Sequence, residues 1–209
     1  NAGLSLDAGS NQNVFIGEDV SDGAMNDATE NVAIGYAALS AVTTGDSNVM
    51  IGAYTGNDIT TGAENVAIGG GTMDKLVSGA KNTAVGFNAF DAADGAESDN
   101  IAIGYDAMGN ANSDSSLYNV VIGSYAGDAF GTAAIESTVL IGNNAGSAIN
   151  HANGAGTVAV GLNSLKALTS GGYNTAVGYQ AGEANTVGSG SVYIGFEAGE
   201  ANQGDENIA

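Results

Sequence analysis

Apolar and polar positions alternate in one short phrase that recurs along the whole chain. The type example is Asn31-Val32-Ala33-Ile34-Gly35, and successive copies end at glycines 17 to 19 residues apart. Self-similarity at a short, fixed period is typical of a solenoid, in which one structural unit is stacked many times along an axis. We therefore expect residues 1–209 to form a single repeat array. The eleven glycines that end the copies are Gly17, Gly35, Gly52, Gly69, Gly86, Gly104, Gly123, Gly142, Gly161, Gly178 and Gly195.

In each copy, two mostly β-branched residues flank one other residue. The residue directly before the glycine is always Ile or Val, as in Ile34, and the residue two earlier is Val, Ile or Thr, as in Val32. Side chains two residues apart lie on the same face of a strand. The pattern predicts one strand per copy, with the equivalents of Val32 and Ile34 forming aliphatic ladders in the core.

The residue between the two ladders is never charged and is most often alanine, as in Ala33, Ala84 and Ala176. A solvated face would carry polar residues there, so both faces of the strand are predicted to be buried. Small side chains allow close approach, and further copies of the same chain are the simplest partner. This pattern predicts a homotrimer.

Other recurring positions complete the predicted turn. An apolar residue seven after the glycine, as in Val42, predicts the inward position of a second, less regular strand. Glycines such as Gly45 predict corners that require positive φ. An asparagine four before the glycine predicts a hydrogen-bonded ladder. The fold expected is an all-β parallel β-solenoid of about 12 turns, ~55 Å long. Its structural ladder includes Asn31, Val32, Ile34, Gly35, Asn174, Val177 and Gly178.

Both ends of the chain lie within a repeat. Asn1-Ala2-Gly3-Leu4 is similar to Asn144-Ala145-Gly146-Ser147, and Asn207-Ile208-Ala209 opens a twelfth copy. A free solenoid needs polar caps at its ends, and neither end has one. We expect the chain to be a segment of a longer fibre, cut in mid-repeat at both ends.

Composition narrows the possible partners. The chain has 3 Lys and Arg against 23 Asp and Glu, a net charge of −20, and no cysteine. It lacks the basic surface that nucleic acid or an anionic membrane requires, and no apolar run is long enough for membrane insertion. Without cysteine there is no disulfide framework and no thiolate zinc site.

The repeats resemble those of known surface fibres. Asn174-Thr175-Ala176-Val177-Gly178-Tyr179-Gln180-Ala181-Gly182 resembles the head repeats of trimeric autotransporter adhesins and is equally similar to repeats in some bacteriophage tail fibres. The resemblance implies a left-handed β-roll of three chains that attaches to a host cell or other surface through a receptor or glycan. It implies an extracellular, cell-surface or virion location. The repeats here exceed the usual adhesin repeat in length, which implies longer corners.

Three other functions and one other fold remain open. A triangular hexapeptide helix also suits an 18-residue turn, but Ser40 and Asp46 stand where further aliphatic residues would be needed. A structural extracellular filament or surface-layer solenoid would share the fold. An ice-binding solenoid would use threonine ranks such as Thr43-Thr44 and Thr60-Thr61. A polysaccharide-acting β-helix enzyme would need a cleft with clustered acids.

Few residues suggest site chemistry. Carboxylates five after the glycine could form a Ca²⁺-binding edge, although a solvated acidic edge is the interpretation we favour. That candidate edge comprises Asp74, Asp91, Glu183 and Glu200. Apart from this possible Ca²⁺, no cofactor is expected.

Aromatic residues just after the glycine are predicted to stack in the core, with sugar binding as the alternative. They are Tyr36, Phe87, Tyr105, Tyr179 and Phe196. The only histidine, His151, stands in a loop-like stretch and is predicted to be exposed. No catalytic set emerges, so we expect no enzyme.

Overall fold

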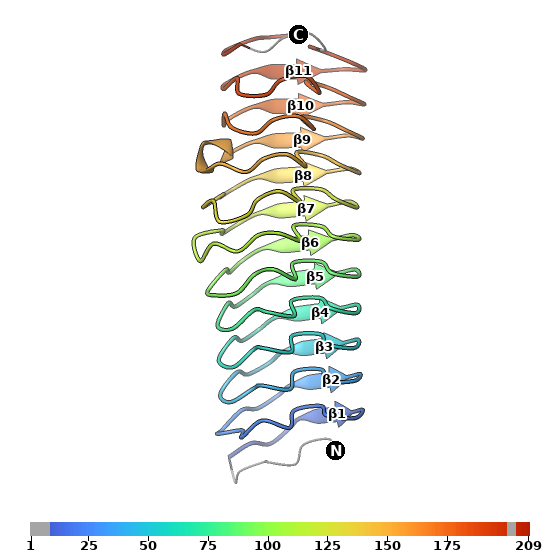
Figure 1. Ribbon diagram of the computed structural model, residues 1–209, viewed down its shortest axis with the longest axis vertical. Helices are drawn as coiled ribbons and strands as arrows, with labels where there is room; N and C mark the ends of the chain where they lie inside the picture. Colours follow the sequence, from blue (N-terminus) through green and yellow to red (C-terminus); the bar gives the residue numbers. More distant parts are fainter. Residues whose placement is uncertain (1–8, 200–203) are drawn as a thin grey trace.

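The computed structural model describes residues 9–199 and 204–209, which form a rod of stacked turns (Figure 1). Each turn contributes one short strand of three residues. The strands are β1 (Val14–Ile16), β2 (Val32–Ile34), β3 (Val49–Ile51), β4 (Val66–Ile68), β5 (Thr83–Val85), β6 (Ile101–Ile103), β7 (Val120–Ile122), β8 (Val139–Ile141), β9 (Val158–Val160), β10 (Thr175–Val177) and β11 (Val192–Ile194).

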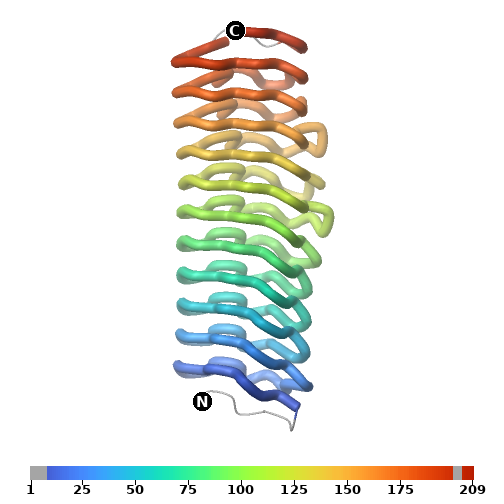
Figure 2. The backbone as a smooth tube through the Cα atoms, turned by 180° about the vertical axis from the view of Figure 1, so that it is seen from behind, coloured from blue at the N-terminus to red at the C-terminus, as the bar shows by residue number. Residues whose placement is uncertain are grey.

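All eleven strands belong to one parallel sheet in chain order, β1 to β11. The register is constant, so each residue lies opposite its equivalent in the next repeat: Val32 opposite Val49 and Ala33 opposite Met50. The strands follow one side of the rod, and the return runs follow the other, in a left-handed coil (Figures 1 and 2). The parallel β-solenoid is confirmed. Within the described part of the chain there is one sheet, whereas a triangular helix would have three.

The predicted orientation of the strand side chains was wrong. The middle residue points into the coil, and from β2 to β11 it is at most 1% exposed. The flanking Val and Ile residues point outward and are half-buried or exposed. The strand and the return run lie close together, so the inward position needs a small residue in most turns. Alanine therefore reflects the narrow interior of a single coil and not close contact with another chain.

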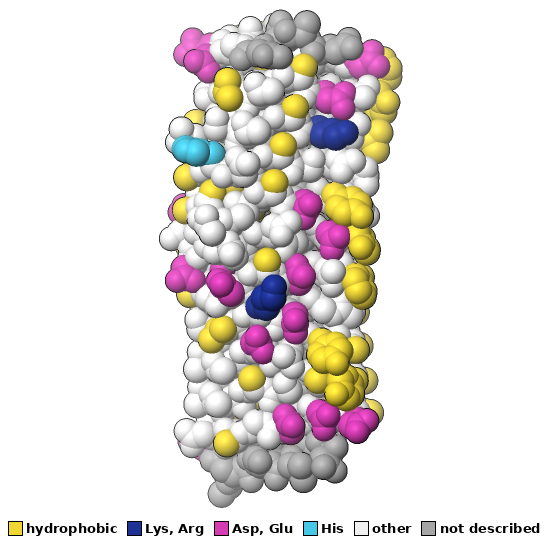
Figure 3. Space-filling model, viewed as in Figure 1, with side chains coloured by type: hydrophobic (Ala, Val, Ile, Leu, Met, Phe, Trp, Pro, Cys, Tyr) yellow, Lys and Arg dark blue, Asp and Glu magenta, His cyan; other side chains and the backbone are white. Residues whose placement is uncertain are grey.

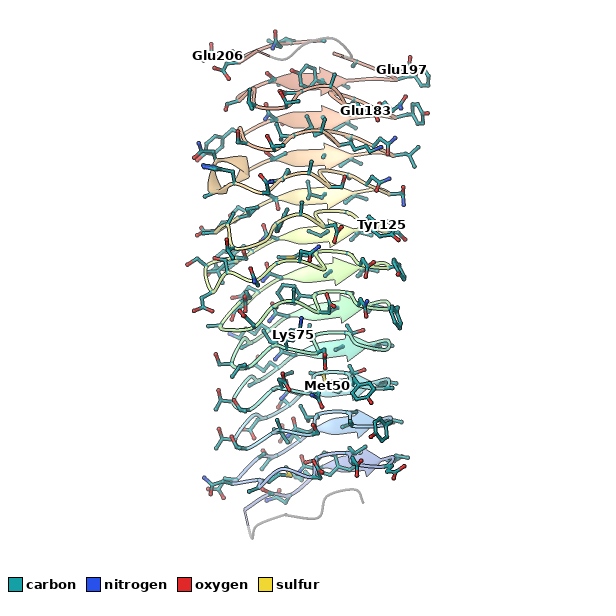
Figure 4. The ribbon with its side chains drawn as sticks, in the orientation of Figure 1. Met50, Lys75, Tyr125, Glu183, Glu197 and Glu206 are labelled. Carbon is teal, nitrogen blue, oxygen red and sulfur yellow. The ribbon has the colours of Figure 1, made fainter. Side chains whose placement is uncertain are left out.

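In each described turn except that of β10, the narrow core takes one bulky side chain from either of two facing positions. In the β10 turn both positions are small, Ala176 and Gly182, and Leu165 and Tyr193 from the adjoining turns lie close to Gly182. Ala33 on the strand pairs with Leu39, four residues after the glycine, whereas Met50 pairs with Gly56. A Cβ on Gly56 would lie 2.7 Å from the Met50 sulfur, which occupies the space inside the coil (Figure 4). The same exchange recurs as Ala67/Met73, Ala84/Phe90, Ala102/Met108, Val121/Gly127, Leu140/Gly146, Ala159/Leu165 and Tyr193/Gly199.

The return run is not the second strand that the sequence predicted. Residues two and four after the glycine have positive φ, such as Ala37 at 51° and Leu39 at 52°, which coils the backbone. The apolar position seven after the glycine is nevertheless buried, as in Val42, Ile59 and Leu76. Backbone bonds still join successive turns: the Thr43 amide donates to the Thr60 carbonyl at 2.9 Å.

The corner glycines are needed for close approach and not, in most turns, for positive φ. Gly45 and Gly62 have ordinary φ, but a Cβ on Gly45 would collide with the Gly62 carbonyl oxygen on the next turn. The anchor glycines need both properties. Gly35 has φ of 143°, and its added Cβ would collide with the Gly52 carbonyl oxygen. The anchor column is glycine in all eleven copies because successive turns are in direct backbone contact there. In the corner column, other residues replace glycine in some turns: Ala28, Glu97, Ser116 and Ile135.

The predicted asparagine ladder is present and buried. The Asn48 amide N–H and its Nδ2 both donate to Asn31 Oδ1, at 2.9 and 3.0 Å, and Asn48 Nδ2 also donates to the Gly62 carbonyl at 2.9 Å. The pattern continues through Asn65, Asn82, Asn100 and Asn119. It stops after Thr138 and resumes at Asn174, whose Oδ1 accepts from the Ser191 amide.

The ends of the array are only partly described. Asn1 to Leu4, which supported the expectation of a mid-repeat start, lie outside the described residues. Ile208 pairs in parallel with Val192, so the twelfth copy begins as the next rung of the sheet. No helix in the described ranges is long and apolar enough to cross a membrane.

Candidate interaction surfaces

The outer face of the sheet is apolar along its whole length. We call it the aliphatic face and define it as the first and third residues of β1–β11, which are Val or Ile except for Thr83 and Thr175. Exposure reaches 57% at Ile16 and 63% at Ile194, and 40% at Ile68 in the middle. Eleven rungs spaced by ~4.8 Å make this face about 50 Å long. Continuous exposed apolar surface of this kind marks an interaction site.

The charged residues lie elsewhere. The strands occupy the side nearest the viewer in Figure 2, and no strand residue is charged. On the opposite side, carboxylates run down the rod with a few lysines among them (Figure 3). The strand residues therefore form an uncharged, mostly apolar strip, and the opposite side carries carboxylates.

A column of aromatic residues follows the edge where each strand ends; Tyr125 points outward there (Figure 4). We call this the aromatic column: Tyr36, Tyr54, Phe87, Tyr105, Tyr125, Tyr179 and Phe196, all between 41% and 72% exposed. The prediction of core stacking was therefore wrong. Strand alternation cannot be extended past the anchor glycine, because its positive φ redirects the chain. Tyr54 and Tyr125 were not predicted for this column, because they stand two residues after their glycines instead of one.

Rings of the aromatic column pack on one another. Phe87 and Tyr105 are stacked at a centroid distance of 5.9 Å, and Tyr179 and Phe196 at 5.2 Å. Tyr36 with Tyr54 and Tyr105 with Tyr125 meet edge to face instead, at centroid distances of 5.2 and 5.3 Å. Two nearby groups raise the pKa of the Tyr36 hydroxyl: Tyr54 has the larger effect and Asp19 the smaller.

The structure describes one of the two carboxylate pairs of the candidate Ca²⁺-binding edge. Asp74 and Asp91 lie on adjacent turns; burial and then Asp58 raise the pKa of Asp74, while Lys75 lowers it. Burial also raises the pKa of Asp91, while the Lys75 ammonium lowers it. The second pair is Glu183 with Glu200, and Glu200 lies outside the described residues. Across the described ranges, no three His, Cys, Asp or Glu residues are grouped to hold a metal.

One buried acid was missed by the sequence analysis. The Glu97 side chain is fully buried; its Oε2 accepts from the Gly95 amide at 3.0 Å, whereas its Oε1 has no partner. Burial raises the pKa of this carboxyl, and Asp114 and Asp94 raise it further. Glutamate at a corner gives no sequence signal of burial, because the side chain folds back into its own loop.

The corner between β8 and β9 departs from the regular repeat. It carries a short 3₁₀ helix, Ala152–Gly154, which projects from the rod (Figure 1). His151 is exposed, as predicted, and its Nδ1 accepts from the Asn153 amide at 3.1 Å. Beside the helix lies an open hollow of about 310 Å³, lined by Ala152, Asn153, Ala155, Gly172, Tyr173 and Ser189.

One threonine of each corner pair is bonded internally. Thr43 Oγ1 donates to the Thr60 carbonyl at 3.0 Å, and Thr60 Oγ1 donates to the Val77 carbonyl at 3.2 Å. These two hydroxyls tie successive turns together, whereas Thr44 and Thr61 are exposed.

Searches for related proteins gave no match to a protein-family model, a curated protein or a solved structure.

Proposed function

We propose that this chain is a segment of a rigid extracellular or virion-borne fibre that attaches to a cell or other surface, and that it acts as a homotrimer. The observation that carries the proposal is the aliphatic face, an uncharged apolar side extending over all eleven strands. Leaving such a face in water is costly, because each buried Val or Ile side chain stabilises by about 1.5–3 kcal/mol.

Further copies of the same chain fit this face best. A net charge of −20 makes two copies repel wherever their acidic sides meet, so close contact is favoured only at the uncharged side. The constant rung spacing is also matched by an identical solenoid, which allows contacts to repeat at every turn. Val and Ile lose little side-chain entropy on burial, because their χ1 angles are already restricted.

The attachment role follows from stiffness and from the corners. A buried asparagine ladder and turn-to-turn backbone bonds resist bending. Corner lengths vary from repeat to repeat while the strand register stays constant, so corners can diversify without disturbing the rod. The similarity of the repeats to adhesin heads and tail fibres supports this function. A filament or surface-layer role would instead assemble the segment into open-ended polymers.

A pair of matched variants tests the proposal. Ile68, on the aliphatic face, is 40% exposed in the single chain, and Val77, at a corner, is 37% exposed. A lysine at either position costs the isolated coil little. We expect Ile68→Lys to reduce the mass measured by light scattering from three chains to one, and Val77→Lys to leave it unchanged. If both variants keep the mass of the unmodified chain, the aliphatic face is not the interface.

A further inference from the structure

We propose that the hollow beside Tyr173 binds one or two rings of a neutral saccharide. The inference names a ligand class for the attachment role proposed above and in that sense rests on it. The site is built within a single chain, from the corner before β9 and the corners of the two turns that follow.

The aromatic ring at this site is exposed and held in place. Tyr173 is 78% exposed, more than any member of the aromatic column. Its backbone has φ of 59°, and its amide donates to the Ala155 carbonyl at 3.1 Å. The ring lies against Gly156, where an added Cβ would be 2.8 Å from the ring. Glycine at this position therefore gives the ring a flat backbone support.

The rest of the hollow is also preformed. Gly154 is buried, with Ile149 so close that a Cβ on the glycine would collide with it, which fixes the 3₁₀ helix on the core. The bond from the Asn153 amide to His151 Nδ1 closes this helix at its start. The asparagine ladder is broken at the same corner, where Thr157 Oγ1 is buried without a partner. This repeat therefore lacks the hydrogen bonds of the asparagine ladder at the same corner where the 3₁₀ helix projects from the rod.

The polar groups at the hollow suit sugar hydroxyls. The Asn153 side chain is exposed and supplies an amide donor and acceptor, and the half-buried Ser189 supplies a hydroxyl. The negative face of the Tyr173 ring attracts the polarised C–H groups on the flat side of a pyranose. A volume of about 310 Å³ is at the small end for ligand sites and suits one or two rings.

Charge selects a neutral ligand. The six lining residues are uncharged, although the chain carries 23 carboxylates. Acidic residues stand one turn away on either side: the Glu136 carbonyl accepts from the Gly156 amide, and Asp205 Oδ1 accepts from the Ser189 amide. The Asp205 carboxylate, bonded to the lining residue Ser189, repels sialylated or uronic-acid sugars, so uncharged hexoses and N-acetylhexosamines are favoured.

Saturation-transfer NMR with the full chain tests the site, using the methyl glycosides of glucose, galactose, N-acetylglucosamine and sialic acid. We expect signals from at least one neutral glycoside at about millimolar affinity and none from the sialoside. Tyr173→Ala should weaken binding about tenfold or more, because the stacking surface is lost.

Tyr118→Ala is the matched control. Tyr118 occupies the same repeat position, with φ of 61° and 59% exposure, but it does not line the hollow. The Tyr118→Ala variant should bind the neutral glycosides as the unmodified chain does. Absence of signal from every neutral glycoside, binding of the sialoside alone, or full binding by Tyr173→Ala would each overturn the inference.

The outcome can be separated from the trimer proposal. The hollow needs one chain only, so the Ile68→Lys variant should keep its saccharide signal even as a monomer. If the unmodified chain is a monomer that still gives a saccharide signal, the trimer proposal is wrong and the binding site stands. If the chain is a stable trimer that gives no saccharide signal, the binding site is wrong and the trimer proposal stands.

Discussion

At the scale of single residues, the interior of each described turn except that of β10 takes one large side chain from either of two facing positions. Met50 on β3 fills the space that Leu39 fills one turn earlier, and the opposite position is then Gly56 or Ala33. A close-packed core penalises both an empty and a doubly filled turn. The residue in the middle of the strand is therefore coupled to the residue four after the anchor glycine of the same turn.

A double-mutant cycle at Met50 and Gly56 tests this coupling. Met50→Ala should cost about 2–5 kcal/mol by leaving a cavity, and Gly56→Leu about 1–3 kcal/mol by overpacking. The double variant reproduces the Ala33/Leu39 arrangement and should recover at least about 1 kcal/mol of the summed loss. Urea denaturation measures all three free energies of unfolding. Strict additivity would show that the two positions do not share one space.

The buried Glu97 carboxyl is expected to lower the stability of the folded chain in a pH-dependent way. Its pKa is raised by burial in the folded chain, so between the unfolded and folded pKa values only the folded state holds the proton. Stability then falls as pH rises through this window, and the penalty is complete above the folded pKa. Glu97→Gln should therefore stabilise the chain at pH 7 by about 1–3 kcal/mol and have little effect below the unfolded pKa.

Melting temperatures of the Glu97→Gln variant across pH 4 to 8 measure this effect. Glu64→Gln, at an exposed position, removes the same charge without the burial and serves as the control. A gain equal to that of the control, or one independent of pH, would contradict the assignment.

At the scale of the element, the asparagine ladder and the strand carry the repeat. The ladder could be predicted from the sequence because Asn recurs at one position and the side-chain bonding of stacked Asn is well defined. The strand positions could also be predicted, but not which face points inward. Strand alternation places Val32 and Ile34 on one face and Ala33 on the other, but it does not say which face points into the coil. The depth of the coil, set by the positive-φ return run, determines that Ala33 points inward.

The ladder predicts position-dependent sensitivity. Asn65 Oδ1 accepts from the Asn82 amide and Nδ2, and Asn65 Nδ2 donates to the Gly79 carbonyl at 2.8 Å. Asn65→Ala leaves these buried groups unpaired and should cost about 2 kcal/mol or more. Asn143→Ala, at an exposed position, should change stability by less than about 0.5 kcal/mol. If chemical denaturation shows equal losses in the free energy of unfolding for Asn65→Ala and Asn143→Ala, the buried ladder does not stabilise the chain more than an exposed asparagine does.

At the scale of the whole molecule, the rod has an apolar side, an acidic side and variable corners. The sequence predicted the stacked solenoid, because a fixed period of 17 to 19 residues permits little else. It did not predict the exposed aromatic column or the hollow beside Tyr173. Both depend on where the backbone turns after the anchor glycine or within a long corner, and neither event has a periodic signature.

The central claim is that the aliphatic face is covered by two further copies of the chain. Light scattering of the purified segment, with and without Ca²⁺, tests this claim most directly. We expect a stable species of three times the 20.4 kDa chain mass, unchanged by Ca²⁺. A monomer of 20.4 kDa over the whole accessible concentration range would contradict it.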